Sequence, residues 1–278
     1  MSVTSNPPGA LTVRPIAISG HCVGSRWVPA DIDRLARTIA VISMGQASHA
    51  AQIIRKVLPA EPPINVEALR TAAKDRLVVA GTTEEQRRVR RYHRDGLIFE
   101  AISWIAAQQT VTGKALLLDP HLSSTTQGLD GLMIELDPSG AAITCATIFE
   151  DKCSEDPRKM FRTEILPAFL AHHENKRAPE LLASVASLLE KAGLDGSAAN
   201  QAAARVLDKA FRAYRASLAI TTADDTPAGR QLLFKDYEQL DGIEVTRRLA
   251  GMLVTADDLR AWFDGLAGKA VAYIDLLG

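Results

Sequence analysis

The sequence predicts an α+β protein in which a small mixed sheet is flanked by helices. Apolar residues recur at three- and four-residue steps near both ends of the chain, which is typical of helices. Two strand-like segments, 129–136 and 141–150, are separated by turn-forming residues, which predicts a β-hairpin. With 278 residues, of which 47% are hydrophobic and 23% charged, the chain is long enough to bury a substantial core.

The overall composition limits which partners the protein is expected to bind and in which compartment it is expected to reside. A net charge of −1 gives no general attraction for nucleic acid or anionic lipid, so any polyanion must be held locally. Three cysteines without a CxxC pair indicate a reducing compartment and no disulfides. The first residues lack the pattern of a secretory signal, and no run of about 20 apolar residues occurs. We therefore expect a cytoplasmic protein that does not interact with membranes.

Residues 1–80 are expected to form a mostly helical N-terminal region. Residues 1–10 have the composition of a loose arm, and 11–27 read as a strand and turn at a sheet edge. Helices are expected from Asp31 to about Gly45, over 46–58 and over 66–79, where prolines and glycine end them.

Residues 81–222 are expected to form the core, and 223–278 a helical, acidic C-terminal region packed on it. The core begins with a long helix over 83–110, capped by Thr82 or Thr83, whose first half is rich in arginine and whose second half is apolar. The remaining core elements are a short strand at 116–118, the hairpin, helices over 158–173, 179–192 and 198–215, and a strand at 216–222.

Two carboxylates stand in apolar surroundings. Glu100 is the only formal charge between Asp95 and Lys114, and a buried carboxylate needs a cation, a donor or water. It could also reach solvent or pair with an arginine of the preceding turn. Asp130 lies at the start of a strand-like run and shares a face with Leu132 by the two-residue period, although an aspartate beside glycine is also common in turns.

An acid and a base lie together at the end of the second strand of the hairpin. Alternation places Glu150 and Lys152 on one face and Asp151 on the other. A solvated strand end with a weak ion pair would give the same tripeptide. A tight turn at residues 138–139 pairs Asp130 with Thr147, about 10 Å along the strand from Glu150, so bringing the two acids together requires a bulge or bend at Gly128 or Gly131.

The order of a helix glutamate, a strand aspartate and a following E-x-K resembles the PD-(D/E)XK nuclease superfamily over about residues 84–175. The resemblance implies a restriction-endonuclease-like core, with Asp130, Glu150 and Lys152 as the motif residues and Glu100 as the accessory glutamate. It implies that Asp130, Glu150 and Glu100 hold Mg²⁺ or Mn²⁺, which prefer oxygen ligands, and that the chain hydrolyses phosphodiester bonds of DNA. Flanking basic residues would contact phosphates: Arg87, Arg91, Arg94, Arg158, Lys159 and Arg162.

The GLDG and FEDK segments are also similar to the nuclease subunits of Hachiman-type anti-phage defence systems, which act beside a helicase. This narrower resemblance implies a role in antiviral defence or restriction, with DNA and a helicase subunit as partners. The alternative is a non-catalytic interaction subunit of a defence or DNA-repair complex that keeps the nuclease fold. No P-loop, dinucleotide-binding or serine-hydrolase motif competes with these interpretations.

Overall fold

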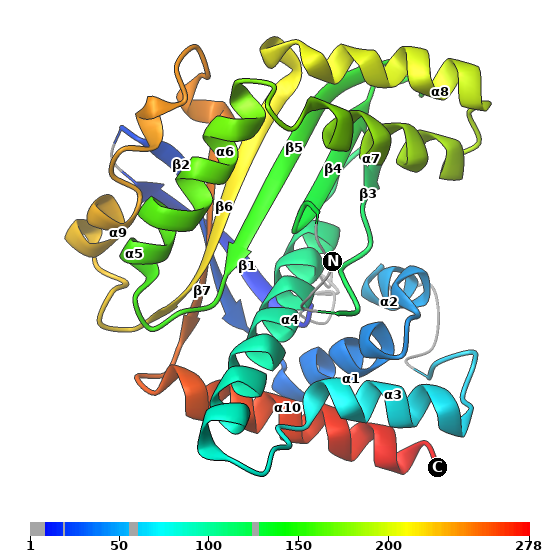
Figure 1. The fold of residues 1–278 in the computed structure, drawn as a ribbon, viewed down its shortest axis with the longest axis vertical. Helices are drawn as coiled ribbons and strands as arrows, with labels where there is room; N and C mark the ends of the chain where they lie inside the picture. Colours follow the sequence, from blue (N-terminus) through cyan, green and yellow to red (C-terminus); the bar gives the residue numbers. More distant parts are fainter. Residues whose placement is uncertain (1–8, 19, 56–60, 124–127) are drawn as a thin grey trace, which may run out of the picture.

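The protein is a mixed α+β structure built around one curled sheet, as expected from the sequence (Figure 1). The structure is a computed structural model that describes residues 9–18, 20–55, 61–123 and 128–278. Most of the arm expected at residues 1–10 lies outside the described residues, and so does the end of the helix expected at 46–58. Among those described, seven strands form the sheet, in the spatial order β1 (Leu11–Ile18), β2 (Cys22–Pro29), β7 (Arg248–Thr255), β6 (Arg212–Thr221), β5 (Ile143–Lys152), β4 (Gly131–Leu136) and β3 (Ala115–Leu117).

The centre of the sheet is parallel and its two margins are antiparallel. Strands β2, β7, β6 and β5 run parallel to one another, whereas β1 pairs antiparallel with β2, and β4 lies antiparallel between β5 and β3. The expected edge strand and turn in residues 11–27 is therefore the β1–β2 hairpin. The expected hairpin over 129–150 is β4–β5.

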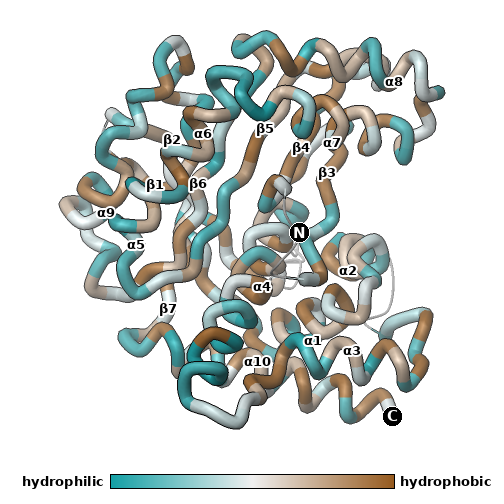
Figure 2. Tube along the Cα trace, in the orientation of Figure 1, coloured by the Kyte–Doolittle hydropathy of each residue, from teal (hydrophilic) through white to brown (hydrophobic). Residues whose placement is uncertain are grey.

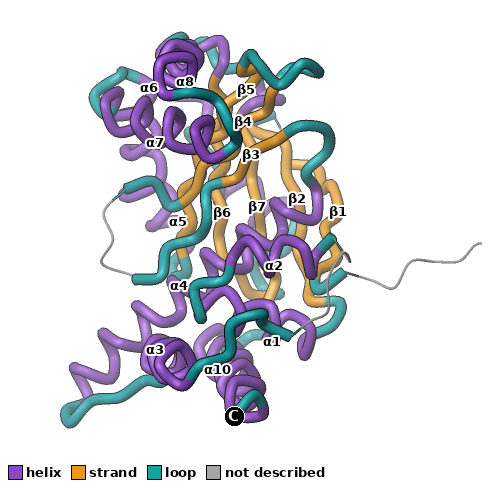
Figure 3. Tube along the Cα trace, turned by 90° about the vertical axis from the view of Figure 1, so that its right-hand side faces the viewer, coloured by secondary structure: helices purple, strands orange, loops and turns teal. Residues whose placement is uncertain are grey.

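Helices cover both faces of the sheet, and the two groups occupy opposite ends of the molecule (Figures 1 and 3). One hydrophobic core lies between the sheet and the helices that follow β5, and the other lies between the sheet and α1, α4 and α10. Hydrophobic segments recur along β4 and β5 in Figure 2. The helices are α1 (Ile32–Ser43), α2 (Ala47–Ile54), α3 (Glu67–Leu77), α4 (Glu84–Thr110), α5 (Pro157–Met160), α6 (Leu166–His173), α7 (Ala178–Lys191), α8 (Gly196–Ala203), α9 (Pro227–Leu233) and α10 (Leu259–Leu276).

Helix α4 begins and ends where the sequence predicts. The Thr83 hydroxyl accepts a hydrogen bond from the Gln86 amide, and the Gln86 side-chain oxygen accepts one from the Thr83 amide, which forms a capping box. None of the described helices combines the length and the apolar character needed to cross a membrane.

The prediction that the tail from residue 231 is entirely helical is wrong. Strand β7 lies in this tail and occupies the middle of the sheet. Its continuous apolar run has no alternation because both faces are buried, and such a run is hard to distinguish from a buried helix.

The prediction of a helix over 198–215 is also wrong in its second half. Strand β6 starts at Arg212, a residue with no exposed surface. The Arg212 guanidinium donates to the carbonyl groups of Val206, His172 and Leu207 and to the Asn175 side chain. Val206 and Leu207 lie just before Arg212 in the chain, but His172 and Asn175 come from a distant turn, so local periodicity gives no sign that this arginine belongs to a strand.

His172 generates a prediction about stability. It is 1% exposed, and neither ring nitrogen has a hydrogen-bond partner in the part of the chain that the structure describes. Burial together with the charges of Arg177 and Arg212 lowers its pKa to about 4. Between pH 6.5 and 4 the unfolded chain binds a proton here and the folded chain does not, so acid favours unfolding. We expect His172→Phe to remove roughly 2–3 kcal/mol of the wild-type loss of stability across this range, measured by urea unfolding.

The exposed His93 supplies the control. His93→Gln should leave the pH profile of unfolding unchanged. A His172→Phe profile parallel to that of the wild type would show that His172 does not resist protonation in the folded state.

Candidate active site

The β4–β5 hairpin brings the predicted aspartate and glutamate together. Gly131 pairs with Phe149, so Asp130 lies beside Glu150 across the two strands. The expected register, with Asp130 opposite Thr147, is wrong because the connection is longer than a two-residue turn and the strands shift between Glu135 and Leu136.

The loop and the shift have identifiable causes. The Asp137 carboxylate accepts hydrogen bonds from the Ser139 hydroxyl and from the amides of Gly140, Ala141 and Ala142, which organise the longer loop and lower the Asp137 pKa to about 2. Thr144 is the extra residue of β5, and its hydroxyl donates to the Glu135 carbonyl. The irregularity thus lies at the far end of the hairpin and not at Gly128 or Gly131.

Gly131 is needed for close packing. A Cβ atom at this position would lie 2.6 Å from a ring carbon of Phe149, a distance that real Cβ atoms essentially never show. Asp130 is therefore followed by a residue without a side chain, and the hairpin keeps its close contact next to the two acids.

Lys152 joins the two carboxylates. Its ammonium nitrogen lies 2.6 Å from an oxygen of Asp130 and 3.3 Å from an oxygen of Glu150. The same Asp130 oxygen accepts the backbone amide of Asp151 at 2.9 Å. The three predicted side chains thus form one charged cluster, with Glu150 and Lys152 on the face of β5 that the sequence indicates.

Burial and like charge make Glu150 the unusual member of this cluster. Only 6% of its side chain is exposed, and burial together with the Asp130 charge raises its pKa to about 8, although Lys152 opposes the change. Burial alone would lower the Lys152 pKa, but the two carboxylates outweigh it and the pKa lies above its ordinary value. The Glu150 carboxyl therefore keeps its proton to a higher pH than an ordinary glutamate does.

Glu100 reaches the edge of this cluster through a histidine. Its carboxylate accepts the backbone amide of His121 at 2.7 Å and lies 3.1 Å from the ring nitrogen Nδ1. The hydrogen bond to Glu100 raises the His121 pKa despite partial burial, and Asp130 adds to the effect. His121 therefore lies in the field of both Glu100 and Asp130, and Glu100 has no direct contact with Lys152 or Glu150.

Helix α7 supplies two groups that the sequence analysis missed. Arg177, just before the helix, lies 4.0 Å from Glu150, donates to the Gly128 carbonyl and pairs with Glu180 at 2.6 Å. An i, i+3 arginine and glutamate at a helix start give no hint of a distant strand. His121 lies in a loop without periodicity, so the sequence pattern gives no reason to select it either.

Asp151 lies on the opposite face of β5, as predicted. Burial raises its pKa to about 6, and the neighbouring charge of Arg215 opposes that change. Arg215 in turn donates to the carbonyl and hydroxyl of Ser103 on α4. These groups connect the strand that carries Glu150 and Lys152 to the helix behind it.

The predicted nucleic-acid residues occupy different environments. Arg94 is 5% exposed and pairs with Asp95 and Asp264, while Arg158 binds Asp236 and two carbonyl groups near α9. Their charges are thus used within the protein. Arg87 pairs with Glu84, Arg91 lies 4.0 Å from Asp264, and Lys159 and Arg162 are exposed after β5.

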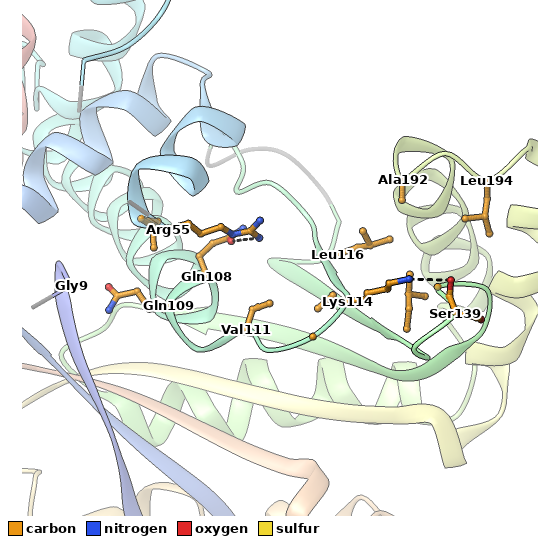
Figure 4. Close-up of a pocket in the computed structure, with 15 residues that line it drawn as sticks. Gly9, Arg55, Gln108, Gln109, Val111, Lys114, Leu116, Ser139, Ala192 and Leu194 are labelled. Carbon is orange, nitrogen blue, oxygen red and sulfur yellow. Dashed lines mark hydrogen bonds between the residues drawn. The ribbon is translucent and has the colours of Figure 1, made fainter. Parts of the chain in front are cut away.

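A groove lies beside the edge strand β3, at the far end of β4 from Asp130 (Figure 4). It has a volume of about 900 Å³, and no acidic residue lines it. Arg55 and Lys114 are its cations; they donate to Gln108 and to the Ser139 carbonyl, so neither is neutralised by these contacts. The part of this groove nearest to Asp130 is at Leu116, which pairs with Ile134, four residues or about 13 Å along β4 from that acid.

A metal ion in this site would need enough ligating side chains from the cluster and its surroundings. Among the described residues no group of three or more His, Cys, Asp or Glu side chains is arranged to hold one. Asp130 and Glu150 supply two carboxylates, and Glu100 is directed to His121. Two carboxylates suit Mg²⁺, which commonly keeps several waters and takes further oxygens from substrate phosphates.

Comparison with known proteins gives no further guide to the site. No family model matches the chain, and no curated protein or solved structure shows significant similarity to it.

The charge of Asp130 should be measurable at Glu150. We expect the Glu150 carboxyl to titrate with a pKa near 8 in the wild type and at a lower pH in Asp130→Asn, because a like charge is removed. Carboxyl ¹³C chemical shifts provide the measurement, and Asp119→Asn at an exposed position is the matched control. An ordinary pKa for Glu150 in the wild type would contradict the burial described here.

Proposed function

We propose that the protein is a metal-dependent nuclease of the restriction-endonuclease-like type that hydrolyses phosphodiester bonds of DNA. The observation that carries this proposal is the cluster of Asp130, Glu150 and Lys152 on adjacent strands, with the lysine ammonium 2.6 Å from one acid and 3.3 Å from the other. Two carboxylates can hold a divalent ion and a lysine can stabilise charge on the phosphate, and phosphodiester hydrolysis can use both functions.

The carboxylates of Asp130 and Glu150 would hold Mg²⁺ or Mn²⁺ together with oxygens of the substrate. The bound ion would neutralise phosphate charge and make a water molecule more acidic. Because Glu150 has a raised pKa and lies against Asp130, the two acids repel each other, and a divalent cation would favour their ionised forms.

Lys152 would then be released from its carboxylate partners and act on the substrate. Its ammonium is a compact charge on a flexible stem, suited to stabilise negative charge on the phosphate or to orient the attacking water. Arg177 is placed to take over the neutralisation of Glu150 when Lys152 turns away, because it already lies 4.0 Å from that carboxylate. Glu100 acts indirectly, by holding His121 beside Asp130.

DNA would approach across the open end of β4 and β5. Lys159 and Arg162 follow β5 and are exposed, so they remain the predicted phosphate contacts best placed near the cluster. The groove with Arg55 and Lys114 offers a second cationic surface (Figure 4). A defence or restriction role beside a helicase remains part of this proposal and rests on the sequence resemblance alone.

Divalent ions should stabilise the folded protein. We expect Mg²⁺ or Mn²⁺ to raise the melting temperature of the wild type because the ion binds the folded state and relieves repulsion between two acids. The rise should be smaller in Asp130→Ala, as followed by scanning calorimetry with Ca²⁺-free buffers. Asp119→Ala is the control, and equal responses in wild type and Asp130→Ala would exclude this metal site.

Lys152 separates catalysis from binding. In Lys152→Ala the carboxylates remain, so we expect turnover to fall by about a hundredfold or more while Mn²⁺ binding persists. Glu150→Ala should lose both. Cleavage of linear, nicked and single-stranded DNA is assayed with and without a helicase partner, and Lys269→Ala at an exposed position of α10 reports general effects of lost charge on DNA affinity.

The alternative function makes the opposite prediction. An interaction subunit would bind its partner equally well in wild type and Lys152→Ala, and neither protein would cut any substrate. That combination of results would replace the enzyme with a non-catalytic subunit that has kept a charged cluster.

A further inference from the structure

The face of the sheet opposite the acidic cluster contains a second cavity. Its volume is about 340 Å³, within the range of small-molecule pockets. It lies beside the C-terminal end of α4 and is lined mainly by apolar atoms of β1, β2, β4, β5 and β7. Exposed residues, among them Pro15, Val23 and Thr110, form part of the lining, so the cavity is accessible from solvent.

A buried cation is part of the wall. Arg215 is 8% exposed, and its guanidinium carbon lies 3.4 Å from the centre of the Phe149 ring and 5.5 Å from that of Trp27. One terminal nitrogen binds Ser103, whereas Nε, which has almost no accessible surface, has no hydrogen-bond partner among the described residues. A buried, charged donor without a partner is costly, and such donors commonly meet a ligand or ordered water.

The other polar side chains that line the cavity already have partners. The Trp27 indole donates to the Ser25 hydroxyl, which donates to the Ala250 carbonyl. The Thr110 hydroxyl donates to carbonyl groups of its own helix, and the Thr147 hydroxyl lies 4.0 Å from the Cys145 sulfur. Arg215 is therefore the group left to recognise a ligand, and it selects negative charge.

Asp151 is the acid that faces Arg215 from β5. It attracts the guanidinium but does not line the cavity, and among the described residues no carboxylate forms an ion pair with Arg215. Asp151 therefore balances only part of the positive charge of Arg215, and it does so from outside the cavity. An anion entering from the cavity would meet the other side of the guanidinium, between two aromatic rings.

We propose that this cavity binds a small aromatic carboxylate, with its ring against Trp27 and Phe149 and its carboxylate on Arg215. Planar apolar walls select the ring, and a charge-assisted hydrogen bond selects the anion. The proposal is independent of the nuclease proposal, because the cavity and the acidic cluster lie on opposite faces of the sheet.

The test compares three probes of the same size by isothermal titration calorimetry: 1-naphthaleneacetate, its neutral acetamide and the cationic 1-naphthaleneacetamidine. We expect saturable binding of the acetate, weaker binding of the acetamide and none of the acetamidine. Arg215→Met with Asp151→Asn removes both charges together, so no buried charge is left unpaired. This double variant should weaken acetate binding by at least about tenfold and leave acetamide binding nearly unchanged.

Two further variants keep the result interpretable if the double variant fails to fold. Ala107→Phe fills the cavity from α4 and should abolish binding of both acetate and acetamide. Lys114→Met removes a cation from the other groove and should change neither. The proposal is wrong if the wild type does not bind the acetate saturably, if acetate and acetamide bind equally, or if Ala107→Phe binds as the wild type does.

Discussion

Two carboxylates in a partly buried site repel each other unless a cation lies between them or one of them keeps its proton, and Lys152 supplies the cation for Asp130 and Glu150. The ion pairs depend on the strand register, since a shift of one residue would carry Glu150 and Lys152 to the other face of the sheet. The register depends in turn on the Asp137 loop, the extra residue Thr144 and the missing side chain at Gly131. The chemistry of the cluster is thus set by backbone geometry as far away as the loop at Asp137, seven residues from Asp130.

Charged groups behind the cluster keep β5 and its exit in place. Asp95 has no exposed surface. It forms ion pairs with Arg94 and Arg260, and the second pair connects α4 to α10 near the end of β5. Burial raises the Asp95 pKa, and the two arginines oppose that change. Such a network costs desolvation energy, but loss of one partner would leave a charge without compensation, so it favours one arrangement of the helices over others.

Local patterns were sufficient for much of the fold and for the centre of the site. The Thr83 cap, the alternation of Glu150 and Lys152, and the turn residues near Asp137 are all recorded in a few consecutive residues. Strand β7, the start of β6 at Arg212 and the approach of His121 and Arg177 depend on contacts between distant segments, which a single sequence does not record. The nucleic-acid residues show the same limit: exposed and ion-paired arginines look alike along a helix, and only the fold separates Arg94 from Arg162.

The order of the strands has a consequence for synthesis of the chain. The hairpin of β1 and β2 contacts the rest of the sheet through β7, which lies more than 200 residues later in the sequence. While the ribosome is still making the middle of the protein, β2 has no neighbouring strand on one side. One edge of β6 is also unpaired until β7 has been made. Contacts of such long sequence separation slow folding and leave strand edges exposed during translation. The protein is therefore expected to complete its sheet late, as one cooperative unit, and to need protection from aggregation until β7 has emerged.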